Sequence, residues 1–89
     1  MISSEDKYRV TEIAKKYDVS KIYLFGSNLL SQSKPHDIDL AVEGLPGSLF
    51  FKFYGELIFA LSQPVDLIDL RKETQLSKII KSEGVLIYG

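Results

Sequence analysis

Three aspartates in two β-rich segments could together bind a divalent cation. Asp37 and Asp39 lie two positions apart in the run 37–42. Side chains alternate between the two faces of a strand, so both carboxylates leave the same face. Two acids this close repel each other unless a cation lies between them, and carboxylate oxygens are ligands that Mg²⁺ prefers. Asp66, near the start of the run 65–70, is the third candidate ligand.

A second element suited to chemistry is Gly26-Ser27, directly after the β-rich run 21–25. Glycine lets the backbone approach a phosphate, the exposed N–H groups can point at it, and the serine hydroxyl adds a donor. A phosphate site followed by metal-binding acids suits phosphoryl or nucleotidyl transfer with two metal ions. Neither element is specific alone, because D-x-D and Gly-Ser are both common.

The elements that must position these residues are predicted from apolar spacing and from turn residues. In chain order we expect a helix over 4–17, a strand over 21–25, an irregular segment over 27–36, a strand over 37–42, a helix over 48–62, a strand over 65–70, a helix from 74 and a strand over 85–88. The second helix carries a broad apolar stripe that includes Tyr54 and Ile58. Gly84 is expected to cap the third helix in the left-handed conformation.

This order predicts an α+β fold, a small mixed sheet flanked by helices. The strand 37–42, the helix 48–62 and the strand 65–70 form a β-α-β crossover, which implies two parallel strands. Parallel strands start at the same edge of a sheet. We therefore expect Asp66 to lie close to the acids of the earlier strand, although it is far from them in sequence.

The ordered combination resembles a known family. Leu24-Phe25-Gly26-Ser27, then nine residues, then Asp37-Ile38-Asp39-Leu40-Ala41-Val42, is similar to the signature of the minimal nucleotidyltransferases, a branch of the DNA polymerase beta superfamily. The strand 65–70 resembles the one that carries the family's third acid, and residues 80–88 resemble its usual C-terminus. The likeness covers nearly the whole chain and implies one nucleotidyltransferase domain over 1–89.

The resemblance also implies roles for individual residues. Gly26 and Ser27 would hold the β- and γ-phosphates of ATP. Asp37 and Asp39 would ligate two Mg²⁺ ions, and Asp66 would hold the catalytic ion and help to remove the proton of the acceptor hydroxyl. Such proteins are often antitoxins paired with a helical HEPN ribonuclease toxin, and some transfer AMP from ATP onto a tyrosine of that toxin. The resemblance thus implies ATP and a HEPN-type toxin as partners.

The sequence departs from the family at one place. Relatives commonly follow Gly-Ser with an Arg-containing stretch, whereas Asn28-Leu29-Leu30-Ser31 stands here. An arginine would offer bidentate contact to phosphate, and Lys34 is the only nearby cation that could compensate. The departure favours an alternative: a catalytically silent module of the same fold that masks a partner protein or assembles with it.

Composition excludes several other classes. Eleven Lys and Arg against 12 Asp and Glu give a net charge of −1, so no basic face is expected for nucleic acid. No apolar run approaches the roughly 20 residues that a membrane span needs, and the acidic start is unlike a secretory signal. The chain has no cysteine, which excludes disulfides and thiolate zinc sites. We expect a cytoplasmic protein.

Other residues have simpler interpretations. His36, in a loop beside a proline, is expected to be exposed rather than catalytic. Asp69 lies three positions from Asp66 and cannot share its face, so it is interpreted as a strand-end acid. Phe59 falls on the polar face of the second helix, and with Phe51 it could mark a contact with a partner or with a second copy.

Overall fold

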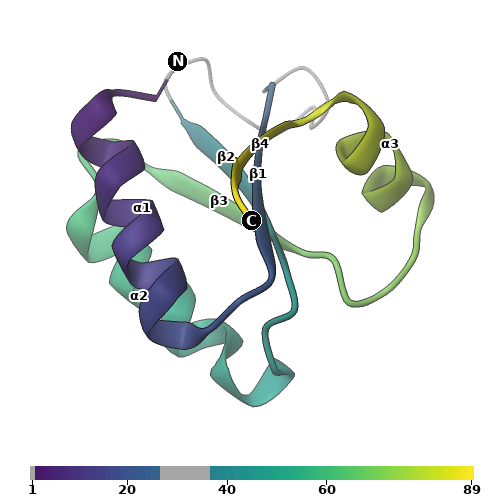
Figure 1. Cartoon of the computed structure of the whole chain (residues 1–89), viewed down its shortest axis with the longest axis horizontal. Coiled ribbons are helices and arrows are strands. Elements are labelled where there is room, and N and C mark those ends of the chain that lie inside the picture. Colours follow the sequence, from purple (N-terminus) through teal and green to yellow (C-terminus); the bar gives the residue numbers. More distant parts are fainter. Residues whose placement is uncertain (1, 27–36) are drawn as a thin grey trace.

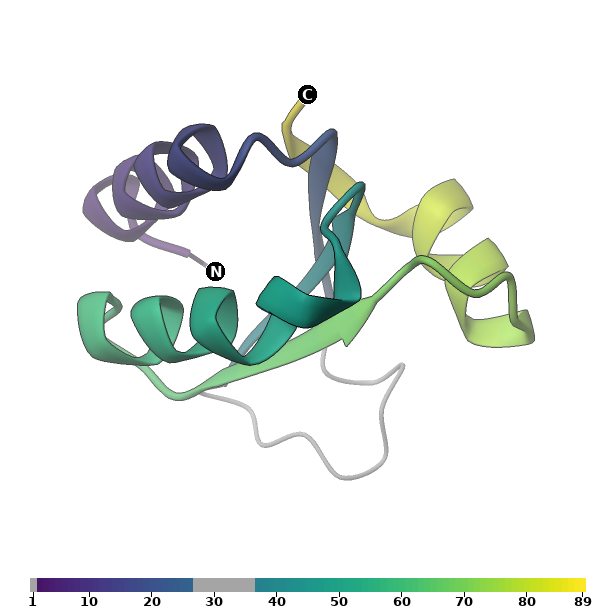
Figure 2. The same ribbon diagram turned by 90° about the horizontal axis from the view of Figure 1, so that it is seen from below.

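The computed structural model describes residues 2–26 and 37–89. Its elements are α1 (Ser4–Tyr17), β1 (Lys21–Phe25), β2 (Ile38–Glu43), the short 3₁₀ helix η2 (Gly47–Leu49), α2 (Phe50–Ala60), β3 (Val65–Asp69), α3 (Gln75–Glu83) and β4 (Val85–Tyr88). Helices α1 and α2 cover one side of the sheet, and α3 lies on the other side (Figures 1 and 2). Every predicted element in the described chain is confirmed within a few residues.

The four strands form one mixed sheet in the order β3-β2-β1-β4. Strand β1 is antiparallel to both of its neighbours, whereas β2 and β3 are parallel. The parallel pair confirms the predicted β-α-β crossover through α2. Among the described strands, β3 lies at the edge of the sheet with β2 as its single neighbour. Because the two strands are parallel, β3 begins beside the start of β2.

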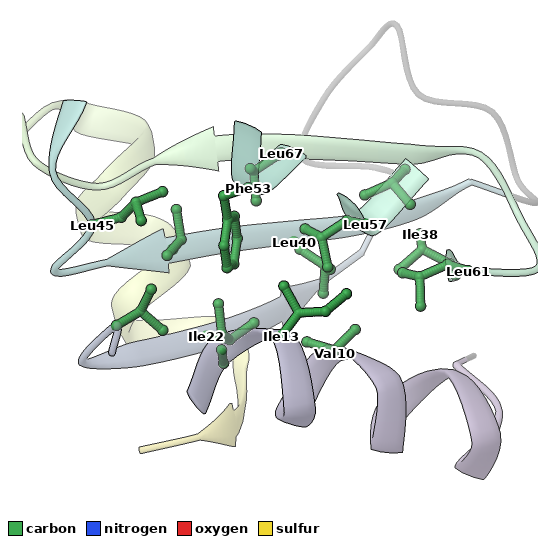
Figure 3. Close-up of a cluster of buried hydrophobic side chains, with 14 residues drawn as sticks. Val10, Ile13, Ile22, Ile38, Leu40, Leu45, Phe53, Leu57, Leu61 and Leu67 are labelled. Carbon is green, nitrogen blue, oxygen red and sulfur yellow. The ribbon is translucent and has the colours of Figure 1, made fainter. Parts of the chain in front are cut away.

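Two hydrophobic clusters lie on opposite faces of the sheet. The larger one packs between the sheet and the helices α1 and α2 (Figure 3). Strand β2 contributes Ile38, Leu40 and Val42 to it, each buried. The smaller cluster lies on the other face and consists of Tyr23, Phe25, Ala41, Leu70 and Ile80. Because residues alternate along β2, Asp39 shares the face of Ala41 and lies away from the larger core.

Two expectations about side chains and caps are wrong. Ile58 was expected in the apolar stripe of α2 but is 57% exposed, because α2 rests on the sheet and α1 over a narrower stripe centred on Phe53 and Leu57. Gly84 ends α3 in an extended conformation, with φ −71° and ψ 161°. A Cβ atom there would lie 2.6 Å from the carbonyl oxygen of Ile80. Glycine is therefore needed for close backbone approach rather than for a left-handed turn.

The start of α1 is tied to the end of α2. Ser3 caps α1, and its hydroxyl accepts a hydrogen bond from the backbone N–H of Asp6. The Asp6 carboxylate in turn accepts hydrogen bonds from the backbone N–H and the hydroxyl of Ser62, just after α2. Within residues 2–26 and 37–89, no helix has the length and apolar character to span a membrane.

Candidate functional site

The register of the parallel pair places two of the predicted acids side by side. Asp39 on β2 pairs with Asp66 on β3, one step after the pair formed by Ile38 and Val65. Paired residues of neighbouring strands point to the same face, and the strands are about 4.8 Å apart. Two carboxylates separated by 27 positions in sequence are thus neighbours on one face of the sheet.

Burial differs among the three acids. Asp39 is 2% exposed, whereas Asp37 and Asp66 are partly exposed. Asp37 immediately precedes β2 and is two positions before Asp39, so strand alternation directs it to the same side. At the edge where β2 and β3 begin, Asp39 is therefore buried, whereas Asp37 and Asp66 reach the surface.

Gly26 lies at the same end of the sheet. It follows β1 directly, is exposed, and comes after Phe25, whose register partner on β2 is Asp39. The predicted phosphate-binding backbone and the acids thus meet at one edge. Ser27, Lys34, His36 and the segment 28–31 lie outside the described residues, and their predicted roles stay predictions.

The donor chemistry of this edge fits a hard divalent cation. The acids offer only carboxylate oxygens, and like charges at paired positions repel each other unless a cation or a proton separates them. Within residues 2–26 and 37–89, however, no group of three or more His, Cys, Asp and Glu side chains is gathered closely enough to ligate one ion. The support for the site comes from strand register and shared face, and the three-acid metal site stays a prediction.

Asp69 is hydrogen-bonded to a residue of the turn that follows β3. This last residue of β3 accepts hydrogen bonds from the backbone N–H and the Nε of Arg71, at 2.9 and 2.7 Å. By alternation its side chain leaves the face opposite to that of Asp66. Asp69 therefore stabilises the turn after β3, in keeping with its interpretation as a strand-end acid.

Tyr54 is a neighbour of the acids that the sequence did not single out. Its hydroxyl donates a hydrogen bond to the carbonyl oxygen of Val65, at 2.7 Å. Burial raises the pKa of Tyr54, and the negative charges of Asp66 and Asp37 raise it further. Helical spacing placed Tyr54 correctly in the apolar stripe, but only the tertiary contact shows its hydroxyl beside the site.

A sheet of this topology, with carboxylates at paired positions of β2 and β3 and a glycine after β1, defines a nucleotidyltransferase domain. The model of the family "Polymerase beta, Nucleotidyltransferase" matches residues 9–89. The chain therefore belongs to this family, and the resemblance to the minimal nucleotidyltransferases is confirmed. No curated protein sequence matches the chain.

The solved structures of similar fold include toxin–antitoxin complexes. A chain of a toxin–antitoxin structure with AMP-PNP is 27% identical, with a TM-score of 0.70 over 93% of this chain and 73% of that one. A chain of the MntA–HepT toxin–antitoxin structure is 24% identical, with a TM-score of 0.73 over 98% of this chain and 73% of that one. A third similar chain, from Shewanella oneidensis, is 24% identical, with a TM-score of 0.70 over 98% and 72%.

The surface of α1 and α2 carries exposed aromatic side chains. Phe59 is 94% exposed, as its position on the polar face of the helix predicted, and Phe51 is 83% exposed. Phe59 also lines a groove of about 440 Å³ between the two helices, together with Tyr8, Arg9, Glu12, Ile13 and Ala60. That these side chains contact a partner or a second copy stays a prediction.

Proposed function

We propose that this chain is a Mg²⁺-dependent nucleotidyltransferase that transfers AMP from ATP to a hydroxyl group of a protein partner. The observation that carries the proposal is the pairing of Asp39 with Asp66 across β2 and β3, at the end of the sheet where Gly26 follows β1. Membership of the polymerase beta nucleotidyltransferase family supports the reaction class. One of the similar toxin–antitoxin structures was solved with AMP-PNP, and this supports an adenine nucleotide as substrate.

Each site residue would have a distinct role in the reaction. Gly26 and Ser27 would bind the β- and γ-phosphates, and Lys34 would be an additional cation. The roles of Ser27 and Lys34 are assigned from the sequence. Asp37, Asp39 and Asp66 would hold two Mg²⁺ ions, which when bound stabilise negative charge on the phosphates and on the leaving pyrophosphate.

Asp66, the partly exposed acid on the edge strand, would take the proton from the acceptor hydroxyl. The acceptor oxygen then bonds to the α-phosphorus, and the bond between that phosphorus and the oxygen bridging to the β-phosphate breaks. Pyrophosphate leaves, and the partner carries AMP on its hydroxyl.

The expected partner is a HEPN-type toxin, with this chain as the antitoxin. Solved structures of similar fold are toxin–antitoxin complexes, and this supports a toxin as the protein that accepts AMP.

The proposal is tested by mixing the protein with labelled ATP, Mg²⁺ and the product of the neighbouring gene. We expect a labelled partner whose mass increases by one or more AMP groups, and loss of the label when Mg²⁺ is chelated. Asp39→Asn and Asp66→Asn should each abolish labelling. Labelling at the wild-type rate in both variants would contradict the assignment.

Asp69→Asn is the matched control. It changes the same residue type on the same strand as Asp66→Asn, but on the opposite face, where the carboxylate accepts from Arg71. We expect normal labelling in this variant. Equal loss in Asp66→Asn and Asp69→Asn would show that the strand as a whole, rather than the site face, had been damaged.

The silent-module alternative rests on the segment 28–31, which replaces the Arg-containing stretch of relatives. Thermal stabilisation by ATP with Mg²⁺ separates the two hypotheses. A ligand at 100 times its Kd stabilises the folded state by about 2.7 kcal/mol, whereas a module that only docks should show almost no change. The measurement uses this chain alone and needs no partner.

A further inference from the structure

We propose that Tyr54 is a positioning residue that fixes Asp66 by capping the outer edge of β3. The inference rests on the proposed function, because it concerns how the site's edge-strand acid is held. Three observations carry it: the position of β3 at the edge of the described sheet, the hydrogen bond of the Tyr54 hydroxyl to Val65, and the anchoring of the tyrosine ring.

Among the described strands, β3 pairs with β2 alone and has no strand on its other side. The backbone N–H of Ile38 donates to the carbonyl of Pro64, and the N–H of Leu70 donates to the carbonyl of Val42. In a parallel ladder the bonded residues alternate along the strand, so the even-numbered residues from 64 to 70 face β2. The backbone groups of Val65 and Leu67, on either side of Asp66, therefore face away from the sheet.

The Tyr54 hydroxyl lies against these outward-facing groups. It donates to the carbonyl oxygen of Val65 at 2.7 Å, and the backbone of Leu67 lowers the pKa of Tyr54. The hydroxyl thus occupies part of the place that a further strand would take, at the residues that flank Asp66. An edge strand held on one side only opens easily, and this contact closes it locally.

The tyrosine ring is well placed to act as a fixed anchor. It packs against the larger core and meets the ring of Phe50 edge-on, with centroids 6.0 Å apart. Helix α2 itself is held by the fully buried side chains of Phe53 and Leu57. Tyr54 stays protonated at neutral pH, so its hydroxyl remains a donor. The position of Asp66 is thereby fixed relative to the hydrophobic core. Misplacement of a site group by about 1 Å is enough to impair it.

Tyr54→Phe tests the inference because it removes the hydroxyl and keeps the ring. Mn²⁺ is titrated into the protein in the presence of AMP-PNP and followed by electron paramagnetic resonance. We expect Mn²⁺ affinity to fall about tenfold, the lower end of the range for loss of an outer-shell partner. Exchange of the Leu67 amide hydrogen, followed by NMR, should become faster in the same variant.

Tyr17→Phe is the matched control. Tyr17 is also a partly buried tyrosine packed against the larger core, and its hydroxyl donates to the carboxylate of Glu56, away from the contact with β3. A merely structural role predicts equal effects of the two substitutions. We expect Tyr17→Phe to leave Mn²⁺ affinity and Leu67 exchange at wild-type values.

The outcomes separate this inference from the proposed function. Wild-type Mn²⁺ affinity in Tyr54→Phe, or equal weakening in Tyr17→Phe, would overturn the positioning role while the metal site stands. Failure of the wild-type protein to bind Mn²⁺ with AMP-PNP would overturn the proposed function, and the positioning role with it. Unchanged exchange of Leu67 in Tyr54→Phe would overturn the edge cap itself.

Discussion

Asp6 and Asp39 are equally buried, each 2% exposed, but their surroundings differ. The carboxylate of Asp6 accepts hydrogen bonds from the backbone N–H of Ser62 at 3.1 Å and from its hydroxyl at 2.5 Å. At the position paired with Asp39 on the next strand lies a second carboxylate, that of Asp66. Asp6 thus joins two elements of the fold, whereas Asp39 belongs to a pair of acidic positions on one face of the sheet.

The difference indicates what each acid contributes. A buried carboxylate that receives hydrogen bonds can join two parts of the fold, here the first turn of α1 and the segment after α2. A buried carboxylate beside another one adds repulsion, and such an arrangement is typical of a site in which stability is given up for function. The comparison therefore predicts opposite consequences for substitution of the two residues.

The largest expected effect is on catalysis. Asp39→Asn keeps the size of the side chain and removes its charge, and we expect it to lower AMP transfer more than about 100-fold, beyond what loss of an outer-shell partner costs. Asp6→Asn should leave the rate per folded molecule unchanged. Initial rates measured on samples whose folded fraction is known by circular dichroism check both. Equal activity losses would remove the distinction between the two acids.

The next effect is on stability. Asp6→Ala leaves the two Ser62 donors without their acceptor, and we expect it to lower the free energy of unfolding by about 1–3 kcal/mol. The melting temperature would fall by about 4–8 °C for each kcal/mol. Thermal unfolding followed by circular dichroism measures the change, and Ser62→Ala should give a similar loss. A melting temperature within about 1 °C of wild type would contradict a structural role for Asp6.

The pH dependence of this contact follows from the pKa of Asp6. Burial alone would raise that pKa, but the hydrogen bonds from Ser62, with smaller contributions from Ser3 and Arg9, outweigh it and hold the pKa below the ordinary value of 3.8. The contribution is therefore complete above the ordinary pKa and is lost as the pH falls through the lowered folded value. Asp6→Asn should unfold with less dependence on acid pH than wild type.

Most of the fold could be predicted from the sequence, because apolar spacing along α1, β1, β2 and β3 reflects which face each element buries. The shared face of Asp37 and Asp39 follows from strand alternation, and the approach of Asp66 follows from the parallel crossover. These are properties of backbone geometry, which local pattern determines.

Contacts that depend on the relative placement of two elements could not be predicted. The link between Asp6 and Ser62 joins residues 56 positions apart, and no local pattern distinguishes Asp6 from any other acid in a first helical turn. The hydroxyl of Tyr54 reaches β3 only because α2 crosses the sheet at one particular position. The sequence predicted Gly84 as a left-handed helix cap. In the structure, glycine is needed there because a Cβ atom would collide with the backbone of α3.

A smaller effect is expected where α1 meets α2. The Tyr17 hydroxyl donates to Glu56, and this hydrogen bond raises the pKa of Tyr17 to about 12. Its stabilising contribution is complete below the ordinary pKa of 10.0 and is lost as the pH rises from there towards 12. Tyr17→Phe should therefore flatten alkaline unfolding between these pH values, as measured by fluorescence or circular dichroism. The same steep unfolding in both proteins would show that the contact contributes nothing.

The smallest expected change in stability concerns Phe59, whose ring is 94% exposed. Phe59→Ser removes few internal contacts, so we expect the free energy of unfolding to change by no more than about 0.5 kcal/mol. If the ring contacts a partner or a second copy, the same substitution should weaken that association strongly, because buried aromatic side chains dominate interface energetics. Analytical ultracentrifugation of this chain alone and with its partner measures both cases. If the Phe59→Ser protein associates as strongly as wild type, the groove between α1 and α2 has no role in assembly. The functional face of the molecule would then be confined to the acidic edge of β2 and β3.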